Sequence, residues 1–475
     1  MAAPDHFYIT TTLPYVNARP HMGHAVEFVR ADAVARYKER MGYTVLLNTG
    51  TDEHGLKIYR KALEEGREPK EYVDEYAGHF REMTRALGMK DDLNFVRTTD
   101  RDHMAAAQAF WRRCAENGDI YKKKYKVLYC VGCELEKTLS DLVDGECPDH
   151  PGRKPEEIDE ENYFFRFSKY QKQLLDLYSA NRCFVTPAYR LKEIQSFVER
   201  GLEDFSISRL VEKQPWGVPV PDDPEHTMYV WFDALVNYVS VIGWPYDEAR
   251  FKKWWPVTQY AGKDNLRQQS AMWQAMLFSA GLPSSQRIII NGFVISGGQK
   301  MSKTIGNIID PIEVINQYGT DALRYYILRE LNPFEDSDMT MDRFKEAYNA
   351  NLANGLGNLV SRVMKMAETH LDSTPEGAPG AFPEDFRDAF ERFDLQQAAD
   401  VVWEHIRDLD RRIQETEPFK LVKIDEEKAR EIIKELVVGV AEIGDMLAPL
   451  MPETSKKIQE AVTVNRKPET LFERR

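Results

Sequence analysis

Two short motifs, far apart in the chain, carry side chains suited to phosphate chemistry. The first is His-Met-Gly-His at residues 21–24, and the second is Lys-Met-Ser-Lys-Thr at residues 300–304. Imidazole N–H and ammonium groups stabilise the charge that spreads over phosphate oxygens during transfer reactions. We therefore expect the catalytic groups His21, His24, Lys300 and Lys303 to surround a single nucleoside triphosphate.

Each motif follows a segment with the pattern of a β-strand. His6–Thr10 precedes the first motif, which opens an amphipathic helix whose positively polarised N-terminus attracts phosphate. Gly23 allows a nucleotide to approach this backbone closely. Residues 288–295 precede the second motif through a Gly-Gly turn at 297–298, which places the lysines on a loop at the carboxyl end of a strand.

The composition is that of a folded protein with several domains. Of 475 residues, 43% are hydrophobic and 29% are charged, and no apolar run is long enough to span a membrane. The N-terminus lacks the basic and apolar regions of a signal peptide, so we expect a cytoplasmic protein. The net charge of −14 argues against nucleic-acid binding by the whole surface, but not by a local basic face. The best such cluster, the lysine run at 122–126, is more simply interpreted as a solvated charge run.

Three of the five cysteines fall in two short knuckles. Cys130 and Cys133 form the first knuckle, and Cys147 and His150 form the second. Four such ligands suit the tetrahedral coordination of one structural zinc ion. A redox Cys-x-x-Cys pair would leave the second knuckle unexplained, while Asp149 could replace His150 as fourth ligand at a less favourable spacing.

The order of the expected elements predicts an α/β protein with a doubly wound parallel (Rossmann-type) sheet, an inserted zinc-binding domain and an all-α helix-bundle domain. Residues 1–115 are expected to form the first half of the sheet, and residues 116–215 the insertion. Residues 216–325 complete the sheet and carry the lysine loop, and residues 326–475 form the helical part.

Individual elements can also be predicted from periodicity and turn signals. The segments expected to resume the sheet are 229–238, 259–264 and 287–295. The segments expected to be helical in the last part are 344–371, 386–415 and 426–447.

The two motifs resemble the HIGH and KMSKS signatures of class I aminoacyl-tRNA synthetases, and further segments are similar to the methionyl-tRNA synthetases of that class. These segments are Leu13-Pro14-Tyr15, Asp52, Tyr229-Val230-Trp231, Asp233-Ala234, Gly262-Lys263-Asp264 and Trp273. The resemblance covers nearly the full chain. It implies ATP-dependent ligation of L-methionine to tRNA(Met) through methionyl-adenylate, with release of AMP and pyrophosphate.

The resemblance also implies roles for single residues. The implied ATP contacts are Thr10, Gly23, Glu27, Gly262, Asp264, Phe293, Val294, Met301 and Ser302. The implied methionine pocket consists of Leu13, Tyr15, Asp52, Trp231, Ala234, Tyr238 and Trp273, with Asp52 as the anchor for the amino group. The implied anticodon contacts are Asn358, Arg362 and Phe419. Simpler alternatives remain for each set: Glu27 as a first-turn acid on the helix dipole, the aromatic residues as core, and Asn358 with Arg362 as a cap and a surface arginine.

The chain departs from the family pattern at several positions. Gln268-Gln269 replaces the usual Phe-His, Asn265 stands where an aliphatic residue is usual, Thr304 replaces serine and Phe419 replaces tryptophan. We expect the two glutamines and Asn265 to make one wall of the pocket more polar. The threonine keeps the hydroxyl, and a phenyl ring can still stack on an unpaired base.

Other functions fit the sequence less well. The synthetases for leucine, isoleucine and valine need a large editing insertion, for which the 116–215 segment has no room, and the cysteinyl enzyme predicts zinc ligands in the amino-acid pocket. A catalytically silent tRNA-binding relative could have lost its histidines and lysines, but all four are present. A zinc-ribbon nucleic-acid module leaves both phosphate motifs unexplained. We expect a monomer without membrane contact, which binds Mg²⁺ together with ATP.

Overall fold

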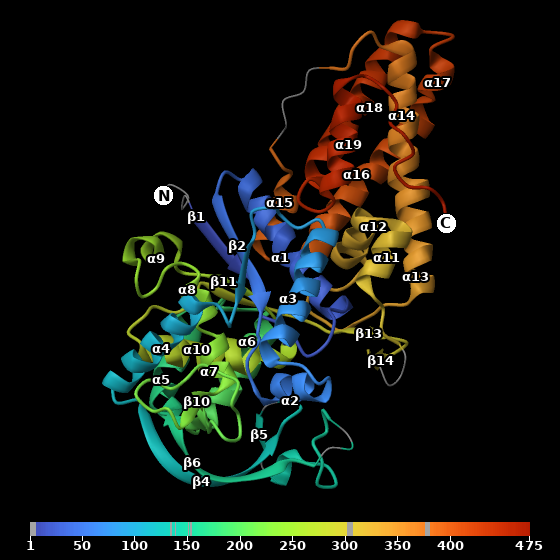
Figure 1. The fold of residues 1–475 in the computed structure, drawn as a ribbon. Coiled ribbons are helices and arrows are strands. Elements are labelled where there is room, and N and C mark those ends of the chain that lie inside the picture. The colour runs from blue at the N-terminus through green and yellow to red at the C-terminus, as the bar shows by residue number, and fades with distance from the viewer. Residues whose placement is uncertain are drawn as a thin grey trace. The chain divides into compact units, whose positions relative to one another are not determined.

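The structure, a computed structural model, describes residues 6–133, 135–137, 139–150, 152, 154–301, 307–375 and 381–475. The chain divides into two compact units, and Figure 1 shows its helices and strands coloured along the sequence. The first unit comprises Met1–Pro20, Val45–Glu82 and Asp92–Ile290. The second unit comprises His21–Thr44, Met83–Asp91 and Asn291–Arg475. None of the helices in these described ranges has the length and hydropathy needed to cross a membrane.

The first unit is built on a six-stranded sheet in the order β3-β2-β1-β11-β12-β7. Its strands are β1 (His6–Thr10), β2 (Thr44–Thr51), β3 (Asn94–Arg97), β7 (Val185–Thr186), β11 (Thr258–Gly262) and β12 (Arg287–Asn291). The pairs β1–β11, β2–β3 and β7–β12 are parallel. Chain order along the sheet reverses between β1 and β11, and open parallel sheets bind ligands at the carboxyl ends of the strands beside such a switch point.

Helices and a large apolar core accompany this sheet. The helices of the first unit are α2 (Leu56–Glu64), α3 (Pro69–Ala86, whose last turn belongs to the second unit), α4 (Arg101–Glu116), α5 (Gln171–Ala180), α6 (Ala188–Glu199), α7 (Val230–Ala234), α8 (Asn237–Ser240), α9 (Glu248–Trp254) and α10 (Trp273–Ser279). A π-helical turn, Gln268–Met272, leads directly into α10. Such turns occur often at functional sites because they redirect side chains within a helix.

An antiparallel sheet in the order β5-β4-β6-β8 carries the cysteine knuckles. Its strands are β4 (Ile120–Cys130), β5 (Leu135–Lys137), β6 (Glu156–Phe165) and β8 (Phe205–Ser206), and β9 (Ser208–Leu210) pairs separately with β10 (His226–Met228). The lysine run of β4 faces an acidic strand, with Lys124 opposite Glu161 and Lys126 opposite Asp159. Because these carboxylates compensate its charge, the run fits the simpler interpretation of a solvated charge run.

The second unit is mostly helical. Its helices are α1 (Met22–Arg40), α11 (Pro311–Tyr318), α12 (Thr320–Tyr325), α13 (Met341–Ala347), α14 (Asn358–His370), α15 (Glu384–Glu391), α16 (Leu395–Thr416), α17 (Pro418–Leu421), α18 (Glu426–Leu447) and α19 (Pro452–Thr463). π-Helical segments, Tyr326–Glu330 and Tyr348–Gly357, continue α12 and join α13 to α14. Helix α18 packs against α14, α16, α17 and α19, which forms the core of a bundle. A small sheet in the order β14-β13-β15 consists of β13 (Val294–Ser296), β14 (Gln299–Lys300) and β15 (Ser337–Asp338).

The predicted fold class is confirmed: a parallel central sheet, an inserted cysteine-rich sheet and a helical C-terminal part. The helices predicted at 344–371 and 426–447 are present. The helix predicted at 386–415 is interrupted, because Phe393 adopts a left-handed backbone with φ of 61°. The strand predicted at 288–295 is split at Gly292, where a Cβ atom would lie 2.1 Å from the Glu335 carbonyl oxygen.

One strand prediction was wrong. Residues 229–238 do not resume the sheet, since they form the short helices α7 and α8. Nearly every side chain in this segment is buried. A short apolar run that is buried on all sides does not distinguish a central strand from a buried helix, and this ambiguity caused the error.

Candidate active site and metal cluster

The N-terminus of α1 is capped by its own two histidines. His21 is the capping residue, and its Nδ1 accepts a hydrogen bond from the backbone N–H of Gly23 at 3.1 Å. The Nδ1 of His24 accepts in turn from the backbone N–H of His21 at 3.2 Å. The two rings stack with their centroids 3.9 Å apart. Both imidazoles are therefore held at the positive end of the helix, where an anion is favoured.

The protonation of His24 follows from these contacts. Desolvation and the neighbouring His21 hold the pKa of His24 well below its ordinary value, so the ring is neutral near physiological pH. A neutral ring whose Nδ1 accepts a hydrogen bond carries its proton on Nε2. His24 therefore presents Nε2–H as a donor on the ring edge opposite the cap.

A buried arginine ties α1 to the base of the lysine loop within the second unit. The Arg30 residue is 1% exposed, and its Nη1 donates to Asn291 Oδ1 and to the Pro333 carbonyl, both at 3.0 Å. Its Nη2 donates to the carbonyls of Leu331 and Asn332 at 3.2 and 2.9 Å. These acceptors precede β13 and β15, which pair with each other. Arg30 thus fixes the histidine helix relative to the strand that leads into the lysine motif.

In the first unit, Thr10 and Gly262 end the two strands that flank the switch point. Thr10 lies opposite Gln259 in the β1–β11 ladder. Its side chain is fully buried, and its Oγ1 has no hydrogen-bond partner within the described residues. A Cβ atom at position 262 would lie 2.7 Å from Asp264 Oδ1. The Asp264 carboxylate therefore lies close over the end of β11, and a larger residue at position 262 would displace it.

Three residues of the predicted methionine pocket meet beyond the carboxyl end of β2. Tyr15 and Asp52 form an isolated parallel bridge, and the Asp52 backbone N–H donates to the Pro14 carbonyl at 2.9 Å. The Tyr15 ring lies edge-on to the Trp231 indole, with centroids 6.2 Å apart. Asp52 is 2% exposed, whereas Leu13, Tyr15 and Trp231 are partly exposed. A nearly buried carboxylate thus lies beside aromatic rings that solvent reaches.

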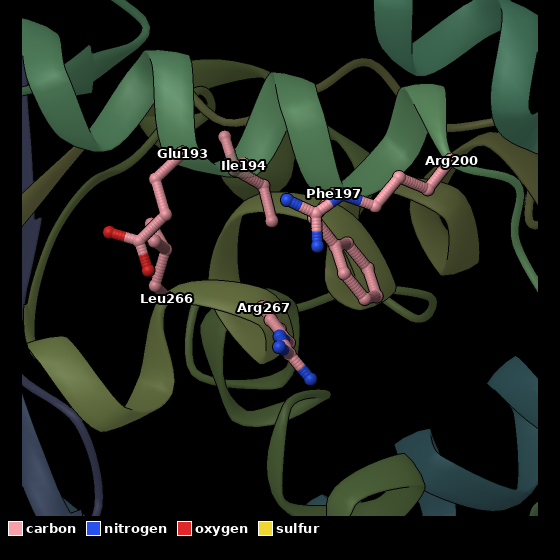
Figure 2. A pocket seen from close by; sticks show the side chains of 6 residues that line it. All are labelled: Glu193, Ile194, Phe197, Arg200, Leu266 and Arg267. Carbon is pink, nitrogen blue, oxygen red and sulfur yellow. The ribbon is translucent and has the colours of Figure 1, made fainter.

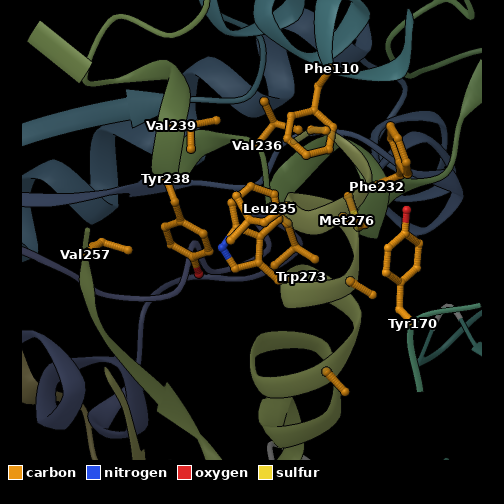
Figure 3. Close-up of a cluster of buried hydrophobic side chains, with 14 of the residues drawn as sticks. Phe110, Tyr170, Phe232, Leu235, Val236, Tyr238, Val239, Val257, Trp273 and Met276 are labelled. Carbon is orange, nitrogen blue, oxygen red and sulfur yellow. The ribbon is translucent and has the colours of Figure 1, made fainter. Parts of the chain in front are cut away.

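Tyr238 and Trp273 lie deeper, in the apolar core of the first unit (Figure 3). Their ring centroids are 5.8 Å apart, and Trp273 also stacks on Phe110 at 5.6 Å. The Tyr238 hydroxyl accepts a hydrogen bond from Gln269 Nε2 at 2.9 Å. Gln269 accepts in turn from Gln259 Nε2 at 2.9 Å. The glutamine that departs from the family pattern therefore orients Tyr238.

The two cysteine knuckles come together as a cluster able to hold a metal ion. The ligand atoms of Cys130, Cys133, Cys147 and His150 all lie within 4.8 Å of one another. The sulfurs of Cys133 and Cys147 are 3.7 Å apart, and Cys130 Sγ lies 3.8 Å from His150 Nδ1. These are edges of a tetrahedron around an ion with bonds of roughly 2.0–2.3 Å. A disulfide would bring sulfurs to about 2.05 Å, so the spacing favours metal coordination.

The surroundings of the cluster support His150 as its fourth member. The ring of His150 packs on Gly132, where a Cβ atom would lie 2.5 Å from the ring carbons. Asp149 lies instead 3.8 Å from Lys137 Nζ, and its side chain is 64% exposed. The carbonyl of Gly132 accepts a hydrogen bond from Lys57 Nζ at 3.0 Å, which anchors the first knuckle to α2.

Comparison with known proteins decides the family. The family model described as tRNA synthetases class I (M) matches residues 7–154 and 150–364. The chain belongs to this family. A methionine–tRNA ligase of Thermotoga maritima is 39% identical over 481 residues, which cover 97% of this chain and 76% of that protein. A methionine–tRNA ligase of a Nostoc species is 41% identical over 477 residues, which cover 96% of this chain and 89% of that protein.

Solved structures agree. Mycobacterium tuberculosis methionyl-tRNA synthetase in complex with methionyl-adenylate has a TM-score of 0.89 to this synthetase at 35% identity, with 98% of both chains covered. The apo form of the same enzyme has a TM-score of 0.81 at 32% identity, with 99% of this chain and 97% of that chain covered.

In this class I synthetase, the lysine motif lies partly beyond what the structure describes. β13 and β14 pair antiparallel across the predicted Gly-Gly turn, so the backbone of Lys300 belongs to a strand where the sequence predicted a loop. Ser302 and Lys303 lie outside the described residues, as does the side chain of Lys300, and Met301 is half-buried. The convergence of two imidazoles and two ammonium groups on one triphosphate stays a prediction.

The other residues predicted to contact ATP from the second unit are described. Glu27 is 9% exposed on α1. The Phe293 backbone is engaged within the protein, since its N–H donates to Asp336 Oδ1 at 3.0 Å and its carbonyl accepts from the Ser337 N–H at 2.9 Å. Val294 begins β13 opposite Ser337.

The residues predicted to contact the anticodon lie on the helical bundle of the synthetase. Asn358 is exposed at the start of α14, and Arg362 lies one turn further along. Arg362 Nη1 forms an ion pair with Asp410 Oδ1 of α16 at 3.0 Å. Phe419 on α17 is 46% exposed.

One cavity is lined by none of the predicted site residues. Glu193, Ile194, Phe197, Arg200, Leu266 and Arg267 line a cavity of about 220 Å³ between α6 and the segment after Asp264 (Figure 2). Arg267 lies over the Phe197 ring at 4.5 Å. The cavity is smaller than the roughly 300–1,000 Å³ of typical ligand pockets, and we assign no ligand to it.

Sequence reasoning missed several residues that hold this site together. His54 and His103 both bond to Asp233, and Arg30 ties α1 to the segments that precede β13 and β15. Asp233 and His54 lie beside predicted pocket residues in the sequence, which was a usable signal. His103 lies in an ordinary amphipathic helix, and nothing in its sequence neighbourhood marks it.

Proposed function

We propose that this synthetase is a methionine–tRNA ligase, which condenses methionine with ATP to methionyl-adenylate and then transfers the methionyl group to tRNA(Met). The nearly buried Asp52 carboxylate beside the Tyr15–Trp231 pair carries this proposal. An α-amino acid with an apolar side chain needs such a pairing of anionic anchor and aromatic slot. The relatives named methionine–tRNA ligase and the neighbour bound to methionyl-adenylate support the same substrate.

Activation needs no general base, because the methionine carboxylate is already an anion when it attacks the α-phosphate. The protein must hold two anions in line and stabilise the charge on the phosphate oxygens. Nε2–H groups of His21 and His24 suit the α-phosphate, and Lys300 and Lys303 suit the β- and γ-phosphates. Mg²⁺ is proposed to accompany ATP, held mainly by phosphate and water.

The remaining ATP contacts are proposed from the strand ends and from α1. Thr10, Gly23 and Gly262 let phosphate and ribose approach the backbone, Glu27 and Asp264 bind the ribose hydroxyls, and Met301 and Ser302 complete the lysine loop. For adenine we favour Val294, since the Phe293 N–H is already donated to Asp336.

In the methionine pocket, Asp52 binds the ammonium group, while the thioether lies among the aromatic rings. The proposed lining is Leu13, Tyr15, Trp231, Ala234, Tyr238 and Trp273. Sulfur–aromatic contacts contribute about 0.3–1.5 kcal/mol each. Shape must therefore provide most of the selectivity.

We propose that the metal in the cysteine cluster is one structural zinc ion. Three thiolates and one imidazole at tetrahedral spacing are typical of zinc, and all four ligand positions are filled by the protein. A closed coordination shell supports folding of the knuckles and leaves no open position for chemistry. We further propose a cytoplasmic monomer.

Exchange of labelled pyrophosphate into ATP tests the proposed function. Among the twenty amino acids, methionine should support exchange with a kcat/KM at least about a hundred times that of any other, in the range that pocket shape can provide. Dependence on a different amino acid would overturn the methionine assignment while keeping the family.

Substitutions in the helical bundle should impair the charging of tRNA without impairing the activation of methionine. Alanine at Asn358 or Arg362 should lower kcat/KM for charging tRNA(Met) by about tenfold to a hundredfold, because each variant loses hydrogen bonds to an unpaired base, and losing one partner of such a bond costs about 1–3 kcal/mol. Pyrophosphate exchange should stay unchanged. Asp410→Asn, which frees Arg362 without removing it, is the matched control and should preserve charging. Equal losses in both assays would show that these residues only hold the bundle together.

The pH dependence of exchange should reflect the lowered pKa of His24. The rate should stay flat as the pH falls from about 8 through about 6.5, where an ordinary histidine gains its proton. At lower pH, protonation removes the Nδ1 acceptor that binds the His21 N–H, so the rate should drop. A midpoint near 6.5 in kcat for exchange would contradict the proposed neutral donor.

A further inference from the structure

Asp233 is a buried carboxylate that lies between two proposed pocket residues, Trp231 and Ala234, on α7. It is fully buried. Its Oδ2 lies 2.5 Å from His54 Nδ1, and its Oδ1 lies 2.8 Å from His103 Nε2. A carboxylate anion only accepts hydrogen bonds, so each imidazole donates one to it.

The electrostatics of this cluster keep Asp233 charged. Burial raises the pKa of the carboxyl, but the charges and hydrogen bonds of His54 and His103 outweigh it and lower the pKa to about 2. Both histidines are themselves nearly inaccessible, at 3% and 2% exposure. A buried anion with two donors is rigidly placed, because loss of either donor leaves part of its charge unsatisfied.

The two histidines connect α7 to separate parts of the first unit. His54 follows Asp52 by two residues, and its bond to Asp233 joins positions 179 residues apart. His103 belongs to α4, and its Nδ1 lies 3.2 Å from Ser240 Oγ on α8. The carboxylate therefore joins the segment of the amino-group anchor, the helix of the thioether wall, and α4.

A second set of hydrogen bonds holds the C-terminal end of the same helix, next to Asp233. Asn237 Nδ2 donates to the Ala234 carbonyl at 2.7 Å, and Asn48 Nδ2 of β2 donates to Asn237 Oδ1 at 3.3 Å. Asn94 Nδ2 of β3 donates to Asn48 Oδ1 at 2.6 Å. The chain segment that contains Asp52 is thus tied to α7 on both sides of that residue, through Asn48 and Asn237 before it and through His54 after it.

The segment of Asp52 is also fixed from its own side. Glu53 accepts two hydrogen bonds from the Arg97 guanidinium at 2.6 and 2.8 Å. The Glu53 carbonyl accepts from Trp216 Nε1 at 2.6 Å. With Glu53 and His54 both held, Asp52 has little freedom to follow a ligand, so the distance from Asp52 to α7 is set by the protein.

We propose that Asp233, clamped by His54 and His103, is a positioning residue that sets the distance between the ammonium anchor Asp52 and the side-chain wall on α7. This distance determines which length of amino-acid side chain the site accepts. The inference rests on the proposed methionine activation. Asp233 would then influence the length of the accepted side chain without contacting the substrate.

A matched pair of substitutions at His103 tests the clamp. Glutamine places an amide N–H where Nε2 lies in histidine, so His103→Gln keeps the donor to Asp233. Leucine of similar volume removes the donor, so His103→Leu leaves the carboxylate with His54 alone. Pyrophosphate exchange is measured with each variant for KM of methionine, KM of ATP and kcat. S-methylcysteine and ethionine, one methylene shorter and longer than methionine, are measured alongside as substrates.

For His103→Leu we expect the KM of methionine to rise about tenfold and the KM of ATP to change by less than about twofold. The preference in kcat/KM for methionine over the shorter and longer analogues should fall about tenfold, since one methylene is worth about 10- to 200-fold in an intact pocket. His103→Gln should restore both values. An unchanged methionine KM, a parallel rise in both KM values, or equal behaviour of the two variants would overturn the clamp.

If His103→Leu does not fold, a matched pair of substitutions at His54 tests the same role of Asp233. Asparagine places its amide N–H where Nδ1 lies in histidine, so His54→Asn keeps the donor and should preserve the methionine KM. His54→Gln places the amide one atom further out and should raise that KM. The proposed function fails separately: wild-type protein without methionine-dependent exchange refutes the substrate, whereas normal wild-type exchange with insensitive variants refutes only the clamp.

Discussion

His24→Asn should lower the kcat of methionine-dependent pyrophosphate exchange by about 100- to 1,000-fold, the usual effect of removing one preorganised donor to a developing oxyanion. Asparagine places its Oδ1 where it can accept the His21 N–H, so the helix cap should survive. The Nε2–H that we assign to the α-phosphate is lost. The KM of ATP should change by less than about threefold, because the donor acts mainly in the transition state.

His24→Gln is the complementary control. Its amide can reach the position of Nε2 but leaves the His21 N–H without its Nδ1 acceptor. We expect this variant to retain more exchange activity than His24→Asn and to unfold at a lower temperature. If the asparagine variant is active and the glutamine variant is not, His24 acts through the helix cap alone. Thermal unfolding of both variants, followed together with exchange, separates these outcomes.

Some elements of the fold could be predicted from the sequence, and others could not. Helix α18 was predicted with its observed bounds, Glu426–Leu447, because its long amphipathic run ends before Pro449 and Pro452. The cysteine cluster could also be predicted, since the types and spacing of its four residues are those of ligands to one metal ion. The helices at 229–238 were missed, because burial on all sides erases the periodicity on which such predictions depend.

The site shows a similar division. Residues in contiguous motifs, such as His21 and His24, could be placed on the right element from spacing alone. The clamp on Asp233 could not, because His103 reaches it from a helix whose sequence pattern is that of any amphipathic helix. Hydrogen bonds between residues far apart in the sequence depend on the tertiary structure, so they cannot be predicted from the pattern of a single sequence.

Cys147→Ser should abolish zinc binding, taking the metal content from about one equivalent to near zero. Cys147 is fully buried, and its Sγ lies 3.7 Å from Cys133 Sγ and 3.9 Å from His150 Nδ1. Structural zinc contributes about 10–16 kcal/mol of apparent binding free energy in small zinc modules. A neutral hydroxyl is a poor replacement for a thiolate, so we expect the knuckles around residues 130–150 to unfold locally.

The choice between His150 and Asp149 provides the sharper test. His150→Ala should lose zinc nearly as completely as the cysteine variant, whereas Asp149→Asn should retain one equivalent, because Asp149 faces Lys137 and solvent. Metal content by elemental analysis and hydrogen exchange of residues 130–150 check both variants. Because Lys57 anchors Gly132 to α2, which follows Asp52 in the chain, loss of zinc should also raise the KM of methionine. Full zinc content in His150→Ala would show that the fourth ligand has been misassigned.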